Sequence, residues 1–355
     1  MKMCERIFGV ISKHNAECAL FLDTVSRRYV SGFESSDGAA IVSGREVVLI
    51  LDSRYYESAL AAGLDGCVRV VLSNRILETV REELTNGCFK RILFDSARMY
   101  VNTLEKIKSV LDDGFELVGV ADPLAKLRAV KTEEEISAIR SAQKITDAAF
   151  AKLISVLNGD MTENCVAYEL DSFIRRAGAV NAFSTIAVSG IRSALPHGVP
   201  TENKITRNSF LTTDFGACYK GYCSDMTRTV VLGKADTEMK RMYEAVINAR
   251  KAAFALIKPG VRCADVDKAA RDVIDGYGYG KYFQHSTGHS LGLEIHELPT
   301  LSSRSEDVLE ENVIVTVEPG VYIPGYCGVR VEDMILVTAD GALSLTGSSD
   351  ELLEI

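Results

Sequence analysis

A short acidic hairpin constrains this chain more than any other stretch of its sequence. Residues 210–230 read FLTTDFGACYKGYCSDMTRTV, in which strand-favouring Val, Thr, Phe and Tyr flank a turn at residues 219–221 whose glycine can adopt a positive φ. Asp214 and Asp225 lie at nearly equal distances from this turn. Antiparallel pairing therefore puts them opposite or nearly opposite on one face, with Cβ atoms roughly 5 Å apart. Two carboxylates this close repel each other unless a proton or a cation lies between them, so the hairpin predicts the floor of a metal site.

The C-terminal part of the chain repeats this acidic pattern. Glu318 and Glu332 flank Gly325 in VTVEPGVYIPGYCGVRVEDMILV, and the same reasoning places them opposite each other across paired strands. Helix pairs joined by glycine-containing turns, around Gly159 and around Gly260, precede the two acidic hairpins. This weak internal repeat predicts two ααββ halves, whose pseudo-twofold arrangement would bring both carboxylate pairs together at the centre.

Histidines are concentrated near these hairpins. Of the five in the chain, His285, His289 and His296 share the stretch HSTGHSLGLEIHELP, and His197 lies in LPHGVP. A single histidine is usually structural, but random scatter does not produce such a cluster. Four carboxylates with one or two imidazoles suit a pair of divalent ions, which bind and deprotonate a bridging water and hold the oxygens of an attacked carbonyl. This oxygen-rich shell favours Mn²⁺, Co²⁺, Fe²⁺ or Zn²⁺ and predicts a metallohydrolase.

The hydrophobic pattern divides the chain into two domains. Up to residue 122, short apolar strands such as 46–51, 68–72 and 91–94 alternate with helical stretches, which is typical of a compact α/β domain. Asp122-Pro123 ends this pattern, and Thr132-Glu133-Glu134-Glu135 forms a capping box that begins a long amphipathic helix. We therefore expect an N-terminal domain over residues 1–122, a linker over 123–131 and a second domain over 132–355.

Charge and cysteine usage limit the partners and the location of the protein. The chain has 40 basic and 49 acidic residues, a net charge of −9, without a basic block, which argues against nucleic acid or an anionic membrane as partner. Its nine cysteines are scattered without a CxxC pair, as in proteins of a reducing cytosol. Cys218 and Cys223, which flank the hairpin turn, are a weaker alternative as soft metal ligands. Neither a signal peptide nor an apolar run long enough to span a membrane is present, so we expect a cytoplasmic protein.

Five separated motifs resemble those of the pita-bread metallopeptidases, in particular the group of Xaa-Pro aminopeptidases and Xaa-Pro dipeptidases (prolidases). They are PHGVP, DFGACYKGYCSDMTRT, HSTGHSLGLEIHELP, VEPGVYIPG and GVRVED, in this order over residues 195–334, and YVSGF and DSRY match more weakly in the N-terminal domain. The resemblance implies a creatinase-type α/β N-terminal domain and an α+β pita-bread catalytic domain with two pseudo-symmetric ααββ halves.

The resemblance also implies roles for the matching residues. The metal ligands would be five in number, with Asp225 and Glu332 bridging two ions: Asp214, Asp225, His289, Glu318 and Glu332. Glu318 would in addition act as general base. The other catalytic residues, His197 and His296, would hydrogen-bond the developing oxyanion or the scissile amide. Three residues would bind the proline and the neighbouring backbone of the substrate, namely His285, Tyr322 and Arg330.

One position departs from the family pattern. Ser290 follows the ligand histidine where the family usually has glycine. We expect the small serine to be tolerated, unless the backbone there has a strained positive φ.

The activity implied by the resemblance is that of a dinuclear metallo-exopeptidase. It would cleave the Xaa-Pro bond at the N-terminus of peptides or in Xaa-Pro dipeptides by attack of a metal-bridged hydroxide on the scissile carbonyl, with Mn²⁺ as the first expected ion and a homodimer as the expected assembly. Methionine aminopeptidase chemistry is one alternative, against which the N-terminal domain argues because minimal methionine enzymes lack it. A non-catalytic binding module is another, against which the complete ligand set argues. The sequence leaves open the native metal and the choice between dipeptidase and aminopeptidase.

Overall fold

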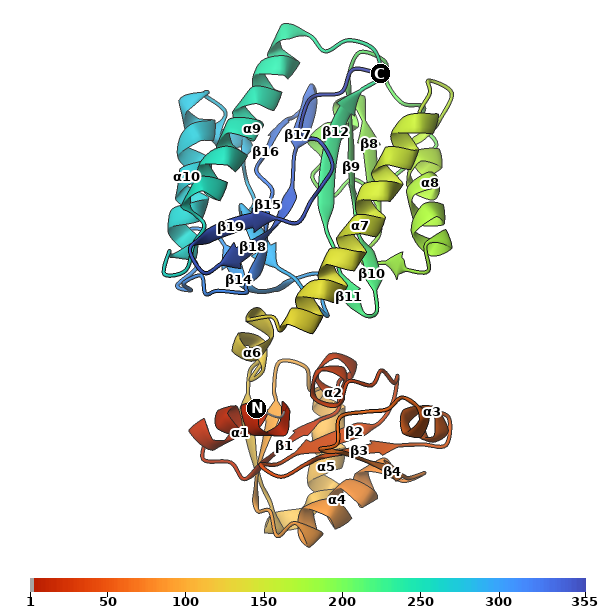
Figure 1. Ribbon diagram of the computed structural model, residues 1–355, viewed down its shortest axis with the longest axis vertical. Coiled ribbons are helices and arrows are strands. Elements are labelled where there is room, and N and C mark those ends of the chain that lie inside the picture. Colours follow the sequence, from red (N-terminus) through yellow and green to blue (C-terminus); the bar gives the residue numbers. More distant parts are fainter. Residues whose placement is uncertain (1–2) are drawn as a thin grey trace. The chain divides into compact units, whose positions relative to one another are not determined.

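The chain divides between Leu127 and Arg128 into two units, of which the computed structural model describes residues 3–355 (Figure 1). The division lies inside the range 123–131 that the sequence assigns to a linker, and part of that range is the short helix α6 (Ala125–Ala129). The exact domain limits stay a prediction. None of the described helices is both long and apolar enough to cross a membrane.

A six-stranded sheet forms the core of the N-terminal unit. Its strands follow the order β4-β3-β2-β1-β5-β6, with antiparallel pairing on both sides of β2 and parallel pairing elsewhere. The side chains of β1, β2 and β3 are buried along the whole of each strand, which explains their continuous apolar runs. The strands are β1 (Cys18–Phe21), β2 (Ala39–Val42), β3 (Val47–Leu51), β4 (Val68–Leu72), β5 (Arg91–Asp95) and β6 (Glu116–Val120). The helices are α1 (Met3–Lys13), α2 (Thr24–Ser31), α3 (Tyr56–Ala61), α4 (Ile76–Asn86) and α5 (Val101–Leu111).

Two helix pairs, each followed by strands, build the C-terminal unit. The first pair is α7 (Glu133–Val156) and α8 (Glu163–Arg176), and the second is α9 (Thr237–Leu256) and α10 (Cys263–Gly276). The capping box predicted at the start of α7 is confirmed, because the Thr132 hydroxyl accepts a hydrogen bond from the Glu135 amide while the Glu135 carboxylate accepts one from the Thr132 amide. Its side chains Ile136, Ile139 and Phe150 are buried, as the periodicity predicts.

Antiparallel strands complete each half of this unit. The first half contains the sheet β12-β9-β8 and the small sheet β11-β10-β7, and the second contains the sheet β14-β13-β15-β18-β19 and the hairpin β16-β17. In the first half the strands are β7 (Val180–Asn181), β8 (Ile186–Ser189), β9 (Phe210–Phe215), β10 (Ala217–Tyr219), β11 (Tyr222–Cys223) and β12 (Met226–Val231). In the second they are β13 (Gly288–Ser290), β14 (Glu297–Leu301), β15 (Ile314–Val317), β16 (Gly320–Ile323), β17 (Cys327–Arg330), β18 (Asp333–Thr338) and β19 (Gly341–Ser344).

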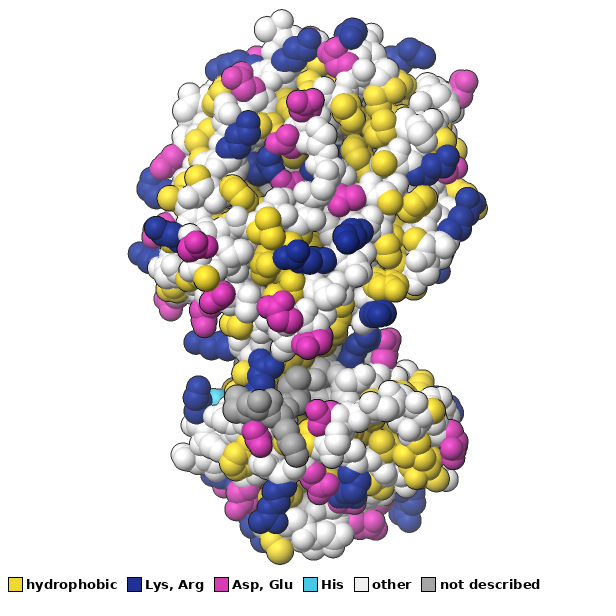
Figure 2. All heavy atoms as spheres, in the orientation of Figure 1, with side chains coloured by type: hydrophobic (Ala, Val, Ile, Leu, Met, Phe, Trp, Pro, Cys, Tyr) yellow, Lys and Arg dark blue, Asp and Glu magenta, His cyan; other side chains and the backbone are white. Residues whose placement is uncertain are grey.

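Each helix pair shares a hydrophobic core with the strands of its own half. Side chains of α7 and α8 pack with β9 and β12 in one cluster, and those of α9 and α10 pack with β15, β17 and β18 in another. In Figure 1 the two helix pairs accordingly lie on opposite flanks of the strands of the C-terminal unit. The predicted ααββ repeat is therefore present. On the face drawn in Figure 2, basic and acidic side chains are interspersed over each unit, which agrees with the absence of a basic block from the sequence.

The capping box provides a test of how far α7 stabilises the C-terminal unit. We expect Thr132→Ala to lower the thermal midpoint of this unit by about 2–4 °C, since losing an N-cap costs about 1 kcal/mol. Ser141→Ala is the matched control, because Ser141 is a partly exposed residue in the middle of the same helix. Differential scanning calorimetry of both variants measures the effect, and an equal response of the two would contradict it.

Candidate metal centre

The first acidic pair is positioned by a tight hairpin. β9 pairs with β12, and Asp214 is opposite Thr227. Asp225 precedes Thr227 by two residues, so it lies on the same face as Asp214 and diagonal to it. At the turn, Lys220 and Gly221 have φ values of 50° and 79°, as in the two-residue turns that join twisted antiparallel strands. The shared face predicted from the sequence is thus confirmed, but the two residues are diagonal neighbours, whose separation is larger than the roughly 5 Å of directly opposite residues.

A close approach of the two strands makes glycine necessary beside this pair. A Cβ atom on Gly216 would come within 1.8 Å of the carbonyl oxygen of Ser224. The strands therefore approach each other at this point only because residue 216 has no side chain.

The second acidic pair is held in the same way. Val317 is opposite Asp333 and Gly320 is opposite Arg330. Continuing this register between the two ladders places Glu318 directly opposite Glu332, as the hairpin interpretation predicts.

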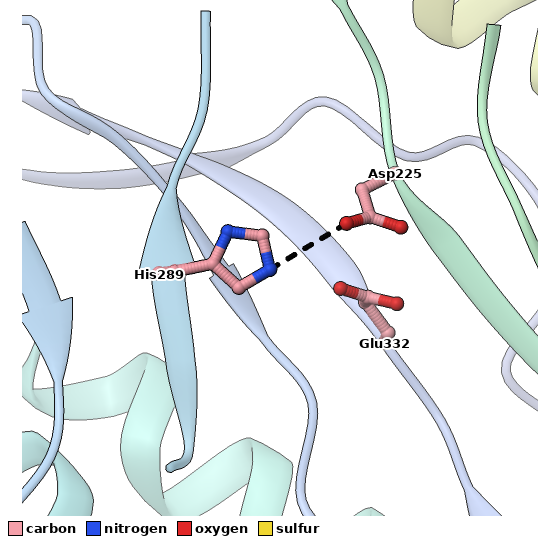
Figure 3. Close-up of side chains that lie close together, drawn as sticks. All are labelled: Asp225, His289 and Glu332. Carbon is pink, nitrogen blue, oxygen red and sulfur yellow. Dashed lines mark ion pairs between the residues drawn. The ribbon is translucent and has the colours of Figure 1, made fainter. Parts of the chain in front are cut away.

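His289 joins the two acidic pairs. Its Nε2 atom lies 3.6 Å from Asp225 Oδ2 and 3.4 Å from Glu318 Oε1, while its Nδ1 atom contacts the Ser290 carbonyl oxygen at 3.0 Å. The ligand atoms of Asp225, His289 and Glu332 all lie within 4.8 Å of one another, and Figure 3 shows the three side chains converging from separate strands and loops. Because the Nδ1 contact fixes the ring, Nε2 is the nitrogen available to a metal ion.

Burial makes this cluster of carboxylates electrostatically unfavourable without a cation. Desolvation, together with the charges of Glu332 and Asp214, raises the pKa of Asp225 well above its ordinary value. Desolvation and the charges of Glu318 and Asp214 do the same to the pKa of Glu332, and desolvation raises the pKa of Glu318 to about 7. Like charges forced together out of water are the cause in each case.

Three carboxylate oxygens of the cluster are available to ligands. Asp214 Oδ1, Asp225 Oδ1 and Glu332 Oε1 are buried and find no hydrogen-bond partner among the described residues. Buried polar atoms are almost always paired, and a hard divalent ion is the partner that oxygen donors beside one imidazole prefer. The residues present therefore fit the divalent ions that the sequence predicts.

A chain of polar side chains extends from Asp214 to the predicted proline-binding residues. Arg330 Nη2 donates to Asp214 Oδ2 at 2.7 Å, and Arg330 Nη1 donates to the Tyr322 hydroxyl at 2.6 Å. The same hydroxyl lies 3.0 Å from His285 Nε2. Burial, followed by the nearby charge of Arg330, lowers the pKa of His285 to about 3, so its imidazole is neutral at physiological pH.

A cavity of about 690 Å³ opens onto the acidic cluster. Four of the five histidines contribute to its wall, namely His197, His285, His289 and His296. The wall also contains Arg330, all four carboxylates and apolar side chains of Phe183, Ile186, Pro196, Val199, Pro200 and Ile295. Tyr322 is the one residue of the predicted set that does not line the cavity. It is buried and reaches the others through its hydroxyl.

The sequence interpretation missed two threonines that position carboxylates. Thr227 donates its hydroxyl to Glu332 Oε2 at 2.7 Å and accepts a hydrogen bond from Arg330 Nε at 2.9 Å. Thr316 donates to Glu318 Oε1 at 3.2 Å. Threonine is an ordinary strand residue, so neither position carried a signal except for its place two residues from a predicted ligand.

Ser290 has a defined hydrogen-bonding role. Its φ is not positive, so the backbone strain that would argue against serine is absent at this residue. The buried Lys131 ammonium donates to Ser290 Oγ at 3.3 Å and lies 3.2 Å from Glu297 Oε2. The serine hydroxyl thus satisfies part of a buried ion-pair cluster next to His289, and its tolerance in catalysis stays a prediction.

Two family profiles match this chain. The profile described as metallopeptidase family M24 matches residues 137–339, and the profile described as creatinase/prolidase N-terminal domain matches residues 4–130. Among similar sequences, the Xaa-Pro dipeptidase of Pyrococcus furiosus is 36% identical over 351 residues, which cover 98% of this chain and 99% of that protein.

Solved structures resemble the whole chain. The Xaa-Pro dipeptidase from Bacillus anthracis has a TM-score of 0.96 at 38% identity and covers 100% of this chain and 99% of its own. The X-Pro aminopeptidase from Thermotoga maritima has a TM-score of 0.92 at 33% identity, with 99% of both chains covered. These similarities confirm the predicted fold class, an α/β N-terminal domain with a pita-bread catalytic domain.

Metal removal and metal addition test the acidic cluster directly. We expect Mn²⁺ at about 100 times its dissociation constant to stabilise the metal-stripped protein by about 2.7 kcal/mol, because it binds only the folded chain. Asp225→Asn should lose most of this gain, yet be at least as stable as the unchanged chain when both lack metal, because one repelling carboxylate is removed. Thermal unfolding with and without Mn²⁺ measures both effects.

The control for this experiment is Asp340→Asn, which neutralises an exposed acid of the same unit. It should respond to Mn²⁺ like the unchanged chain. A destabilised Asp225→Asn protein in the absence of metal would show that the carboxylate is needed for folding rather than for binding an ion.

The neutral state of His285 predicts a pH dependence of stability. With a folded-state pKa of about 3 and an ordinary value near 6.5 in the unfolded chain, only the unfolded chain takes up a proton between these values. Stability is therefore lost as the pH falls from 6.5 towards 3, by about 2 kcal/mol at pH 5. With a chelator present to remove metal ions, the His285→Asn variant should lose less stability than the unchanged chain between pH 7 and pH 5, as measured by urea unfolding. His14→Asn, in the other unit, is the control, and identical pH profiles of all three proteins would contradict the prediction.

Proposed function

This chain belongs to metallopeptidase family M24, and from that premise we propose that it is a dinuclear metallo-exopeptidase that hydrolyses the peptide bond preceding proline. The observation that supports this most is the convergence of four carboxylates and His289 on one cavity, with three of their buried oxygens without hydrogen-bond partners among the described residues. A binding module with no catalytic role would not need an unfavourable cluster of this kind.

The two ions would be held by the five predicted ligands, Asp214, Asp225, His289, Glu318 and Glu332. When bound, such a pair of ions supplies an activated water and positive charge beside the carbonyl oxygen. The oxygen-rich donor set makes Mn²⁺ our first candidate and Co²⁺, Zn²⁺ or Fe²⁺ the alternatives.

Glu318 is our candidate for moving the proton. It lies in the cavity wall and is held by the Thr316 hydroxyl. As a carboxylate it accepts a proton from the attacking water and returns it to the leaving nitrogen. This return is needed because the amide nitrogen leaves only after it is protonated, and the proline nitrogen, which carries no hydrogen in the peptide bond, then leaves as a secondary amine.

His197 and His296 are our candidates for stabilising the oxyanion. Both line the cavity and are more exposed than His289, and the His296 ring packs edge-on against the His289 ring with centroids 4.5 Å apart. An imidazole N–H placed there can hydrogen-bond the developing oxyanion or the scissile amide more strongly than the ground-state carbonyl.

Recognition of proline is assigned to His285, Tyr322 and Arg330. Arg330 is anchored by Asp214 and Tyr322, so its cationic edge and the neutral His285 form a rigid polar border to the apolar wall at Pro196, Val199 and Pro200. A rigid pocket of this shape accepts a ring that lacks an N–H donor, whereas general peptidases lose a contact to it.

Xaa-Pro dipeptides are our first candidate substrates. The relatives named Xaa-Pro dipeptidase, from Pyrococcus furiosus and Bacillus anthracis, are 36% and 38% identical to this chain. Cleavage at the N-terminus of longer peptides is the second candidate, favoured by the similarity to the X-Pro aminopeptidase from Thermotoga maritima.

We further propose that the protein is a cytoplasmic homodimer without nucleic-acid or membrane partners. Light scattering tests the dimer.

The decisive experiment compares substrates on metal-reloaded protein. We expect hydrolysis of an Xaa-Pro dipeptide with Mn²⁺, slower hydrolysis of an Xaa-Pro-Yaa tripeptide, and no hydrolysis of an Xaa-Ala dipeptide. Glu318→Gln should lower kcat by about 10²–10⁴-fold, since it removes the proton carrier, and Asp225→Asn should abolish activity.

Asp340→Asn is again the matched control and should keep full activity. Faster cleavage of the tripeptide would make the protein an aminopeptidase. Absence of cleavage of either proline peptide with Mn²⁺, Co²⁺, Zn²⁺ or Fe²⁺ would overturn the Xaa-Pro assignment, and cleavage of a Met-Ala peptide instead would indicate methionine aminopeptidase chemistry.

A further inference from the structure

Two cysteines face each other across the hairpin that carries the first acidic pair. Cys218 of β10 is directly opposite Cys223 of β11, and the next pair along, Tyr219 and Tyr222, closes the turn. The Ser224 amide donates to the Ala217 carbonyl at 2.8 Å, whereas the Cys223 amide donates outside the hairpin, to Gly292 at 2.8 Å. The cysteines therefore occupy a non-hydrogen-bonded position of the ladder, where Cα atoms are about 4.5 Å apart, within the range of disulfides.

The side chains of this pair are arranged for reaction with an external oxidant. Residues opposite each other in an antiparallel ladder point to the same face, and the two thiols are hydrogen-bonded to each other. Cys218 is partly exposed, while Cys223 is buried. An incoming disulfide therefore reacts with Cys218 first. The Cys223 thiol then lies close enough to attack the Cys218 sulfur.

Another pair of hydrogen-bonded thiols lacks this access. Cys67 contacts Cys4 in the N-terminal unit, but both are buried. Cys88 and Cys165 are exposed, yet neither occupies a paired strand position opposite another cysteine. The combination of a partly exposed thiol with a buried one facing it therefore distinguishes the hairpin.

We propose that Cys218 and Cys223 form a redox modification site, at which a low-molecular-weight disulfide such as oxidised glutathione converts the two thiols into one reversible cross-strand disulfide. The Cys218 sulfur attacks one sulfur of the reagent, which forms a mixed disulfide and releases one molecule of glutathione thiol. The Cys223 sulfur then attacks the Cys218 sulfur and releases the second. Two protein thiols lose two electrons and two protons, and the reagent gains both as two thiols.

Oxidation at this position acts on the metal centre through the backbone. Disulfides most often span a Cα–Cα distance of about 5.5–6 Å, which exceeds the roughly 4.5 Å typical of this ladder position, so bond formation pushes the two strands apart. The hairpin cannot absorb this locally, because Ser224 is hydrogen-bonded to Thr146 and to Ala217 and its carbonyl oxygen is packed against Gly216. The next residue is Asp225, so the displacement reaches the carboxylate that lies 3.6 Å from His289 Nε2. The oxidised protein therefore binds divalent ions more weakly.

Peptide mapping of the full-length protein tests the disulfide. Trypsin cleaves after Arg207, Lys220 and Arg228, so the two cysteines fall on separate peptides, residues 208–220 and 221–228. After treatment with oxidised glutathione and alkylation of remaining thiols, we expect one species in which these peptides are joined, and its separation on reduction. Recovery of the two peptides only in alkylated or glutathionylated form would overturn the proposal.

Single substitutions test the order in which the two cysteines react. Cys223→Ser should retain glutathione on the 208–220 peptide, because the resolving thiol is missing, whereas Cys218→Ser should leave the buried Cys223 largely unmodified. Cys165→Ser, which removes an exposed thiol elsewhere, is the control and should form the linked species normally. Glutathione on Cys223 rather than on Cys218 would overturn the order of attack.

Titration of metal-stripped protein with Mn²⁺ tests the coupling without measuring peptide hydrolysis. We expect oxidation to weaken Mn²⁺ binding about tenfold, an effect that should be absent in Cys218→Ser and be reversed by reductant. Equal affinities of the reduced and oxidised protein would overturn the coupling. Because neither experiment uses a peptide substrate, failure of this proposal and failure of the proposed function are distinguishable.

Discussion

Mutual repulsion among buried carboxylates is the constraint on which the C-terminal unit depends. Asp225 and Glu332 are buried within reach of each other and of His289, and desolvation adds to the cost of their charges. The protein offsets only part of this cost internally, with Arg330 on Asp214 and a threonine hydroxyl on each glutamate. The repulsion that remains is relieved by binding a cation, and it therefore gives the site its affinity for cations.

Two hairpins from different halves must be held rigidly for such a cluster to persist. Hydrogen bonds to main-chain carbonyls make this connection. The Glu332 amide donates to the Thr227 carbonyl at 3.1 Å, and the Thr229 hydroxyl donates to the Arg330 carbonyl at 2.9 Å. The buried Arg228 guanidinium adds a hydrogen bond to the Glu332 carbonyl at 2.6 Å and an ion pair with Asp333. Each acidic pair is therefore fixed through its main chain, which lets the carboxylates stay close in spite of their charge.

The same hairpin carries the residues of both the metal centre and the proposed redox site. Its outer part carries the facing cysteines, and its inner part carries Asp225, with only Ser224 between them. Such proximity couples the oxidation state of one to the geometry of the other, because a strand transmits small displacements along its backbone better than a flexible loop does.

The sequence by itself determined the local features of the fold and of the metal centre. The turn at residues 219–221, the parity that puts Asp214 and Asp225 on one face, the opposition of Glu318 and Glu332 and the capping box at Thr132 all follow from local pairing rules, whose reach is a few residues. The clustering of histidines was equally visible, and the motif resemblance supplied the roles that residue types alone left open.

Tertiary structure decided the rest. Two of the remaining features join segments more than a hundred residues apart, namely the hydrogen bond from Thr227 to Glu332 and the one from Lys131 to Ser290. Which carboxylate oxygens lack a hydrogen-bond partner and the position of Tyr322 outside the cavity wall likewise depend on how the segments pack together. Periodicity fixes the face on which a side chain lies, but not the partner it meets there, because that partner is set by how the two halves pack.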